Sequence, residues 1–271
     1  MQKPFQILLS ISFVLFFYSC SVNKAKIDNE LKQFYSDGTN TEGCFTMLDN
    51  ATGEITVYNI SIDTSRFSPA STFNIPLSLI ALQTGAVTDE KMVIPINSSD
   101  SAHSNVPNQL NIVDAFKQNS FPFFYNVANK IGHDTLTAWM QRLSYGNKST
   151  GKNLDSFWMN NILKISPDEQ LGLLKHLYFD QLPFRKSVHL LVREMMVKED
   201  NSAYKLSYSS SLTKDEKNNN VFWCMGWVEE NRHVYFFVNL EKYSGNSVLK
   251  KEPMGASRKI LEHYGFFKGK K

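Results

Sequence analysis

Short runs of apolar residues near both ends of the chain predict strands. Near the N-terminus, Cys44–Leu48 and Glu54–Ile60 flank the polar, glycine-containing stretch Asp49–Gly53, an arrangement that is typical of a β-hairpin. Toward the C-terminus similar runs recur, and we expect strands over Tyr204–Tyr208, Val221–Trp227 and Val234–Leu240. Glu229–Arg232 supplies the polar turn between the last two of these strands.

Between the two groups of strands, apolar residues recur at intervals of three and four, which is the spacing of a helix face. This pattern extends from Leu110 to about Lys198. A second helical block within it, ending at Tyr178, begins with Ser166-Pro167-Asp168-Glu169, where a serine cap precedes a proline at the first helical position. A last helix is predicted over Ala256–Tyr264.

This order of elements predicts one α+β domain. Strands from both ends of the chain would assemble into one antiparallel sheet flanked by helices, and the segment between them would form an inserted helical lobe. No repeat and no long linker divides the sequence, so we expect one domain over residues 30–271. Ser98–Asn108 is polar and is predicted to be a surface loop.

The first twenty residues predict a targeting segment. Lys3 precedes an apolar run over Phe5–Tyr18 that is too short to span a bilayer comfortably, and Ser19-Cys20 follows it. The segment resembles a bacterial lipoprotein signal, in which residues 1–19 are removed, Cys20 becomes the lipid-modified N-terminus and residues 20–29 form a tether. We therefore expect an exported, membrane-anchored lipoprotein in the periplasm or cell envelope. A plain cleaved signal peptide is the alternative.

Composition narrows the functional classes. With 271 residues, 42% of them hydrophobic, the chain can bury one large core. The net charge of +3 is small and scattered, which argues against a nucleic-acid partner. The six histidines lack metal-ligand spacing and the three cysteines form no CxxC pair, so we predict no metal site and no cofactor. For Cys44 and Cys224, both a disulfide and two separate buried thiols remain open.

The candidate chemistry centres on Pro69–Pro76 and the apolar run Leu77–Gln83 that follows it. These residues predict a tight turn that delivers Ser71 into the first turn of a buried helix, which Gly85 ends. A serine hydroxyl there lies beside free backbone N–H groups and the positive end of the helix dipole, where a developing oxyanion is stabilised. The alternative is that Ser71 only caps the helix.

This stretch resembles the nucleophile segment of the class D, or oxacillinase-type, serine β-lactamases, which belong with the penicillin-binding transpeptidases. The resemblance rests on the run Arg66-Phe67-x-Pro69-Ala70-Ser71-Thr72-Phe73-x-Ile75-Pro76-x-Ser78-Leu79-Ile80-Ala81-Leu82. From about Gly43 to about Leu261 it continues, in the family's order, through Tyr145-Gly146-Asn147, Phe157–Gln170, Gly226–Glu229 and Tyr235–Phe237. It implies the fold predicted above, Ser71 as nucleophile, and a β-lactam or peptidoglycan-like ligand.

The chain departs from the catalytic set that this resemblance implies. An acyl-enzyme mechanism needs a nucleophile, a base, an oxyanion hole and a cation for the substrate carboxylate. The family's base is a lysine, usually carbamylated, at the position of Asn74, whose amide can orient the Ser71 hydroxyl but cannot ionise it. General-base assistance contributes roughly 10²–10⁴-fold, so its loss predicts slow turnover or none. Ser120 matches the family's second serine, a proton relay.

The family's third motif, Lys-Thr/Ser-Gly on an inner strand, aligns with Ser209-Ser210-Ser211. Ser210 keeps the hydroxyl of the motif. Ser209 removes its cation, and Ser211 adds a side chain where glycine lets the substrate approach. The oxyanion hole implied by the resemblance consists of the main-chain N–H groups of Ser71 and Leu212, so side-chain changes need not abolish it.

Three further residues match positions that border the family's cleft, namely Tyr145, Asn147 and Trp158. In the family the tryptophan shields the carbamylated lysine; without that lysine, core packing is the expected role of Trp158. Two hypotheses follow. The chain is either an enzyme of the β-lactamase class with residual acyl transfer through Ser71, or a non-catalytic binding protein for a peptidoglycan-like peptide or a protein partner.

Overall fold

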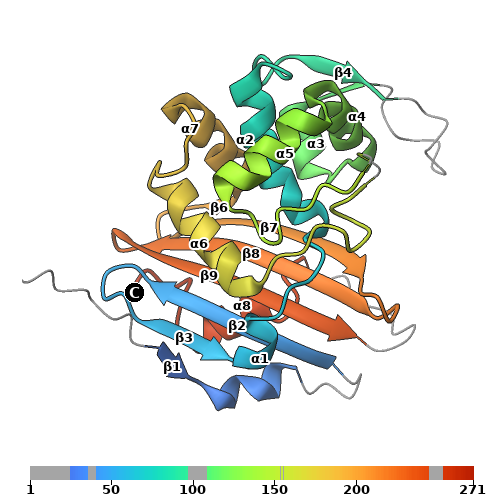
Figure 1. The fold of residues 1–271 in the computed structure, drawn as a ribbon. Helices are drawn as coiled ribbons and strands as arrows, with labels where there is room; N and C mark the ends of the chain where they lie inside the picture. The colour runs from blue at the N-terminus through green and yellow to red at the C-terminus, as the bar shows by residue number, and fades with distance from the viewer. Residues whose placement is uncertain (1–24, 36–40, 97–108, 153, 155, 244–252) are drawn as a thin grey trace, which may run out of the picture.

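The computed structural model describes residues 25–35, 41–96, 109–152, 154, 156–243 and 253–271, and its centre is a seven-stranded sheet (Figure 1). The strand order is β1-β3-β2-β9-β8-β7-β6. The bounds are β1 Ala25–Ile27, β2 Thr41–Asp49, β3 Ile55–Tyr58, β6 Val197–Asp200, β7 Lys205–Lys214, β8 Asn220–Glu230 and β9 His233–Tyr243. A separate two-stranded ribbon pairs β4 Val93–Pro95 with β5 Gln109–Asn111.

The two ends of the chain meet at the centre of this sheet. β2 pairs antiparallel with β9 over its whole length, from Thr41 opposite Tyr243 to Asp49 opposite Tyr235. Every pairing in the sheet is antiparallel except that of β1 with β3. The structure thus confirms an α+β fold in which strands from both termini build one largely antiparallel sheet.

Four of the five predicted strands run further than expected, above all β7, which continues past Tyr208 to Lys214; backbone conformation explains two other differences. β3 ends at Tyr58 rather than Ile60, because Asn59 adopts a left-handed conformation and its side chain accepts a hydrogen bond from the Ile62 N–H, which opens the short helix α1, Ile60–Asp63. The β8–β9 turn is also tighter than expected. Only Asn231 and Arg232 lie outside the strands, and both have positive φ, as a two-residue hairpin turn requires.

The helices between β3 and β6 form the inserted lobe, which covers one face of the sheet (Figure 1). They are η2 Ala70–Phe73, α2 Asn74–Thr84, α3 Ile112–Lys117, α4 Phe121–Ile131, α5 His133–Leu143, α6 Pro167–Tyr178 and α7 Lys186–Met196. The predicted start of α6 is confirmed: Glu169 accepts a hydrogen bond from the Ser166 N–H, and Pro167 is the first helical residue. The predicted last helix is α8, Ser257–His263.

Two apolar cores lie on opposite faces of the sheet. The larger core joins the helical lobe to inward side chains of the sheet such as Trp223 and Met225. The smaller one joins α8 and the short helix η1, Asn29–Phe34, to side chains of the other face, including Phe45 and Phe237. Alternate residues of β8 and β9 therefore enter different cores, which explains why both strands are buried along most of their length.

The two cysteines in these strands are separate buried thiols. Cys44 lies opposite Leu240 of β9 and Cys224 opposite Asn239 of the same strand, so β9 separates them. Both are free, and burial raises the pKa of the Cys44 thiol and raises that of Cys224 to about 12. This outcome resolves the alternative that the sequence left open.

Several predictions fall on other parts of the chain. The signal segment 1–19, Cys20 and the loop Ser98–Asn108 lie outside the described residues. The predicted tether over residues 20–29 is wrong for its second half, because Ala25–Ile27 forms β1, which pairs with β3, and η1 begins at Asn29. Among the residues that are described, no helix has the length and apolar character needed to cross a membrane. The same residues contain no group of three or more metal-ligating side chains.

Asp63 is a buried carboxyl at the end of α1, and its pKa predicts a pH-dependent stability. Burial and, second, the negative charge of Asp168 raise the pKa of Asp63 from 3.8 to about 7, and its Oδ1 has no hydrogen-bond partner. A raised pKa in the folded state means that the folded protein binds the proton more tightly than the unfolded chain. Stability is therefore lost as the pH rises from about 4 to about 7.

We expect Asp63→Asn to remove this loss and to raise the free energy of unfolding by about 1–3 kcal/mol at pH 8, with little effect at pH 4. Urea denaturation at both pH values measures the difference. Glu90→Gln, at an exposed glutamate in the segment after α2, is the control and should change neither value. A variant no more stable than the wild type at pH 8 would contradict the assignment.

Candidate active site

Ser71 lies in a single 3₁₀ turn, η2, that runs directly into α2. η2 covers Ala70–Phe73, and α2 follows from Asn74 and ends at Thr84, where Gly85 takes the left-handed conformation with φ 76°. Ser71 is not a cap, since Pro69 and Phe73 occupy the N-cap positions of η2 and α2 and neither helix has a side-chain cap bond. The alternative interpretation of Ser71 as an N-cap is therefore wrong.

The backbone immediately before Ser71 is strained and is held from two directions. Ala70 has φ 49°, a conformation that is costly for a residue with a Cβ. Its N–H donates to the Trp158 carbonyl at 2.9 Å, and the Ser68 hydroxyl donates to the same oxygen at 2.7 Å. From the sheet, Trp223 Nε1 donates to the Ser68 carbonyl at 2.9 Å. These bonds tie the turn to the lobe and to β8.

Hydrogen bonds between buried polar groups also hold the η2 turn. Thr72 Oγ1 donates to the Pro69 carbonyl at 2.6 Å and accepts a hydrogen bond from Gln170 Nε2 at 3.0 Å. The Tyr145 hydroxyl donates to Gln170 Oε1 at 3.4 Å. Burial raises the pKa of Tyr145, so this phenol stays protonated and acts as a donor.

Aromatic side chains pack against Phe73 of the η2 turn. Phe73 contacts the rings of Tyr145, Phe157 and Trp158, with centroids 5.3–5.6 Å apart. Trp158 is 1% exposed and also contacts Phe121 of α4 at 5.8 Å. Trp158 thus packs in the core, as expected for a site without the shielded lysine.

Gly146 and Asn147 hold the segment that follows Trp158. Gly146 has φ 51°, and a Cβ on it would lie 2.0 Å from the Lys164 carbonyl oxygen. Asn147 donates through Nδ2 to the Ile162 carbonyl at 2.8 Å and accepts from the Lys164 N–H at 3.0 Å. The observed partners of the Tyr145-Gly146-Asn147 triplet are thus protein groups. Its predicted part in ligand binding stays a prediction.

Asn74 and Ser120 contribute buried polar atoms that lack partners. Asn74 is 2% exposed, and its Nδ2 has no hydrogen-bond partner; the Ser120 hydroxyl, at the start of α4, has none either. α2 and α4 pack against each other, so both groups belong to the same part of the lobe. Orphaned buried donors are rare and costly, and they mark a place where a water or ligand group is expected to bind.

The three serines of the aligned third motif lie on β7, next to η2. β6 pairs with β7 only as far as Ser207, so the edge of β7 that carries Ser209–Leu212 has no strand beside it in the described sheet. η2 packs against β7 there, and the Ser211 hydroxyl donates to the Pro69 carbonyl at 3.4 Å. Asn119, just before Ser120, donates to the Ser210 carbonyl at 3.0 Å.

Strand alternation separates these three side chains. β7 pairs with β8 in one continuous register, so Ser209 and Ser211 lie on one face and Ser210 on the other. Ser209 and Ser211 are buried on the face toward the lobe, and Leu212 is 47% exposed. η2, which carries Ser71, packs against β7, and Asn119 links the start of α4 to the same strand, but the hydroxyl of Ser210 lies on the opposite face from Ser209.

The electrostatics of the site follow from its residue types. None of the side chains at the four matched positions, Ser71, Asn74, Ser120 and Ser209, ionises near neutral pH. The N–H groups of Ala70 and Thr72 donate to carbonyls, whereas the Ser71 N–H between them has no carbonyl partner among the described residues. A backbone donor is thus available beside the Ser71 hydroxyl, without a side chain that could act as a base.

The sequence did not reveal three residues that hold the site through hydrogen bonds. Ser68 bonds to the Trp158 carbonyl, Asn119 to the Ser210 carbonyl and Gln170 to the Thr72 hydroxyl. Gln170 was within a matched run, but no sequence signal connected it to Thr72. The strain at Ala70 had no signal either, because alanine is compatible with any ordinary backbone conformation.

Comparison with known proteins places these features in a family. Residues 43–259 match the model of the penicillin binding protein transpeptidase domain. Beta-lactamase OXA-5 of Pseudomonas aeruginosa is 32% identical over 231 residues, which cover 83% of this chain and 85% of that protein. The probable beta-lactamase YbxI of Bacillus subtilis is 30% identical, covering 90% and 86%. A solved class D beta-lactamase from Sebaldella termitidis has a TM-score of 0.83 at 26% identity, covering 90% and 98% of the two chains.

Proposed function

Because this chain belongs to the penicillin-binding protein transpeptidase family, among the class D serine β-lactamases and their relatives, we propose that it recognises β-lactams and is acylated slowly at Ser71. The proposal also holds that hydrolysis is weak or lost, because Asn74 and Ser209 replace the lysines of the family motifs. The names of the relatives, which describe them as β-lactamases, support the ligand class.

The proposed step is the opening of the β-lactam ring by Ser71. Its Oγ bonds to the ring carbonyl carbon, the ring C–N bond breaks, and the hydroxyl proton passes to the ring nitrogen. The product is an ester that keeps every atom of the drug. The partially positive Ser71 N–H, which has no carbonyl partner among the described residues, stabilises the oxyanion that forms during this step.

The proposal rests on the buried, unpartnered amide of Asn74. Its buried amide stands on the helical turn after Ser71 with an unpartnered Nδ2, so it can bind a water or a ligand oxygen but cannot accept a proton near neutral pH. The same deficiency affects both steps, because hydrolysis of the ester also needs a base to activate water. Acylation and hydrolysis are therefore both slow.

A second candidate function rests on the edge of β7. Ser211 places a side chain where the family has glycine, and its hydroxyl donates to the Pro69 carbonyl, two residues before Ser71. The strand edge beyond Ser207 remains without a neighbour in the described sheet. An extended peptide of peptidoglycan type, or a segment of a protein partner, could pair with this edge and bind without any covalent step.

Intact-protein mass spectrometry after incubation with a penicillin tests acylation directly. We expect a slowly formed, persistent adduct of the full mass of the drug, which forms faster as the pH rises because hydroxide replaces the missing base. Ser71→Ala should abolish the adduct, whereas Ser187→Ala, at an exposed serine of α7, should not. No adduct at any pH would favour the binding function. Rapid turnover abolished by Ser71→Ala would contradict the proposed loss of the base.

Restoring the three motif residues tests whether Asn74 and the β7 serines limit the reaction. We expect Asn74→Lys, Ser209→Lys and Ser211→Gly together to raise nitrocefin hydrolysis by about 10²-fold or more over the wild type, the typical contribution of a general base. The same triple variant carrying Ser71→Ala is the control and should lose the gain. A folded triple variant without increased turnover would show that the site has diverged beyond these positions.

We propose, in addition, that the mature protein is exported and anchored in a membrane through a lipid on Cys20. The support is the sequence alone, in which Ser19-Cys20 follows the apolar run Phe5–Tyr18. We expect the native protein to enter the detergent phase in a Triton X-114 separation, and Cys20→Ser to stay in the aqueous phase. An unmodified N-terminus at another residue, found by mass spectrometry, would rule out the anchor.

A further inference from the structure

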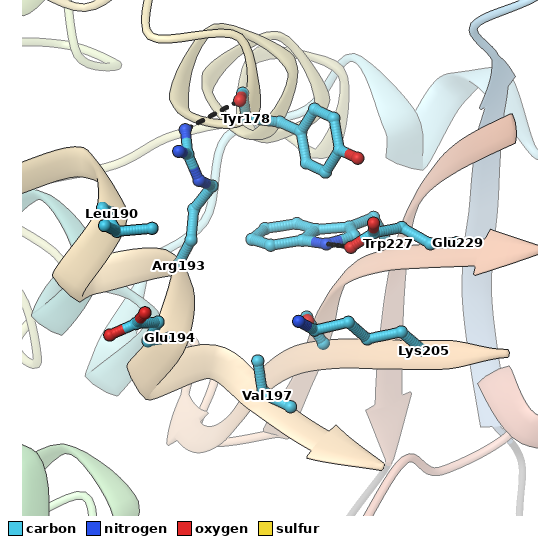
Figure 2. A pocket seen from close by; sticks show the side chains of 9 residues that line it. Tyr178, Leu190, Arg193, Glu194, Val197, Lys205, Trp227 and Glu229 are labelled. Atoms are coloured by element: carbon cyan, nitrogen blue, oxygen red, sulfur yellow. Dashed lines mark hydrogen bonds between the residues drawn. The ribbon is translucent and has the colours of Figure 1, made fainter. Parts of the chain in front are cut away.

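A cavity of about 330 Å³, whose lining does not include Ser71, lies between α6, α7 and the first half of β7 (Figure 2). Helical residues Tyr178 and Arg193 form one side, and Lys205 and Trp227 of the sheet form another. This volume is at the lower end of the range for small-molecule sites, about 300–1,000 Å³, so it suits a ligand the size of an amino acid or dipeptide.

The charged side chains around the cavity alternate in sign. Figure 2 shows Arg193 followed by Glu229, Lys205 and Glu194 around its rim. The rim itself carries two cations and two acids, and Asp180 and Asp200, which pair with Arg193 and Lys205, add two further acids beside it, so a polyanion is disfavoured. A small molecule that carries one charge of each sign satisfies such a rim best.

Hydrogen bonds and ion pairs within the protein already engage some of these charged side chains and leave others available to a ligand. Arg193 Nη1 donates to the carbonyls of Leu177 and Tyr178 and to Asp180, which fixes the guanidinium while its other nitrogens make no hydrogen bond to the described residues. The Glu194 carboxylate makes no ion pair or hydrogen bond with the described residues, and the residue is exposed. Lys205 contacts Asp200 only loosely, at 3.5 Å.

The aromatic wall of the cavity is preformed. The rings of Tyr178 and Trp227 meet edge to face with centroids 5.6 Å apart, and Trp227 Nε1 donates to Glu229 at 3.2 Å. Burial and the nearby Glu229 carboxylate raise the pKa of Tyr178 to about 12, so the phenol remains a donor at neutral pH. Leu190, 51% exposed, adds an apolar surface on the opposite side (Figure 2).

Ser207 provides a second, independent sign of a binding site. It belongs to the cavity lining, its side chain is fully buried, and its hydroxyl has no hydrogen-bond partner. A buried hydroxyl without a partner costs free energy, which a polar group of a ligand would recover.

We propose that this cavity binds a small zwitterion, an α-amino acid or dipeptide with an apolar side chain. Its carboxylate interacts with Arg193 and Lys205, its ammonium group with Glu194, and its side chain packs between Leu190 and Trp227. The Ser207 hydroxyl bonds to a polar atom of the bound molecule. This inference does not depend on acylation at Ser71.

Isothermal titration calorimetry with L-leucine tests the site on the folded protein. We expect a Kd of about 1 mM or tighter, and at least tenfold weaker binding of isocaproate, which lacks the ammonium group, and of isoamylamine, which lacks the carboxylate. Glu194→Gln should weaken leucine binding about tenfold and leave isocaproate unaffected. Glu262→Gln, at an exposed glutamate of α8 on the other side of the sheet, is the matched control.

Two further variants separate this site from the rest of the protein. Ser207→Ala should weaken leucine binding several-fold while the melting temperature stays the same or rises, because the variant removes an unsatisfied buried hydroxyl. Ser71→Ala should leave leucine binding unchanged. No detectable heat with leucine, equal affinity for the three molecules, or an unchanged Kd in Glu194→Gln would each overturn the proposal.

Discussion

The antiparallel pairing of β2 with β9 is the constraint on which the rest of the molecule depends. It joins the two ends of the chain at the centre of the sheet, and the helical lobe must then pack on one face as a closed insertion between β3 and β6. Because β8 and β7 follow β9 in the same sheet, this pairing also sets where the β7 edge meets η2. The site is therefore a contact between the lobe and the C-terminal strands.

At that contact, hydrogen bonds hold the backbone around Ser71, and the four matched positions carry no side chain that ionises near neutral pH. Hydrogen bonds to Trp158 and, through Ser68, to Trp223 hold the strained backbone at Ala70. Such strain costs free energy, and these bonds compensate for it and keep Ser71 in place. The lysine positions carry Asn74 and Ser209 instead, and unpartnered atoms remain at Asn74 and Ser120. The Ser71 N–H remains a backbone donor at this site, and the slow chemistry that we propose follows from the lack of a base beside it.

The face of β7 toward the lobe links two regions of different character. Ser209 and Ser211 lie beside η2, whereas Lys205 and Ser207, on the same face, line the cavity under α7. In the first region, uncharged serine side chains lie beside the backbone of η2. The second is defined by charges of both signs around an aromatic wall. A ligand in the cavity would contact the strand that carries the site, within two residues of Ser209.

The sequence by itself determined the α+β order, the hairpins, the α6 cap and a helix directly after Ser71 that Gly85 ends, since these depend on local periodicity and turn chemistry. It also identified Ser209–Ser211 by motif order. Only the tertiary structure decided that Cys44 and Cys224 remain apart, that Ala70 is strained and that Ser210 faces away from Ser209. It also placed Arg193 and Lys205, which lie on different elements, around one cavity. Such features depend on strand register and on contacts between distant segments, which no local pattern encodes.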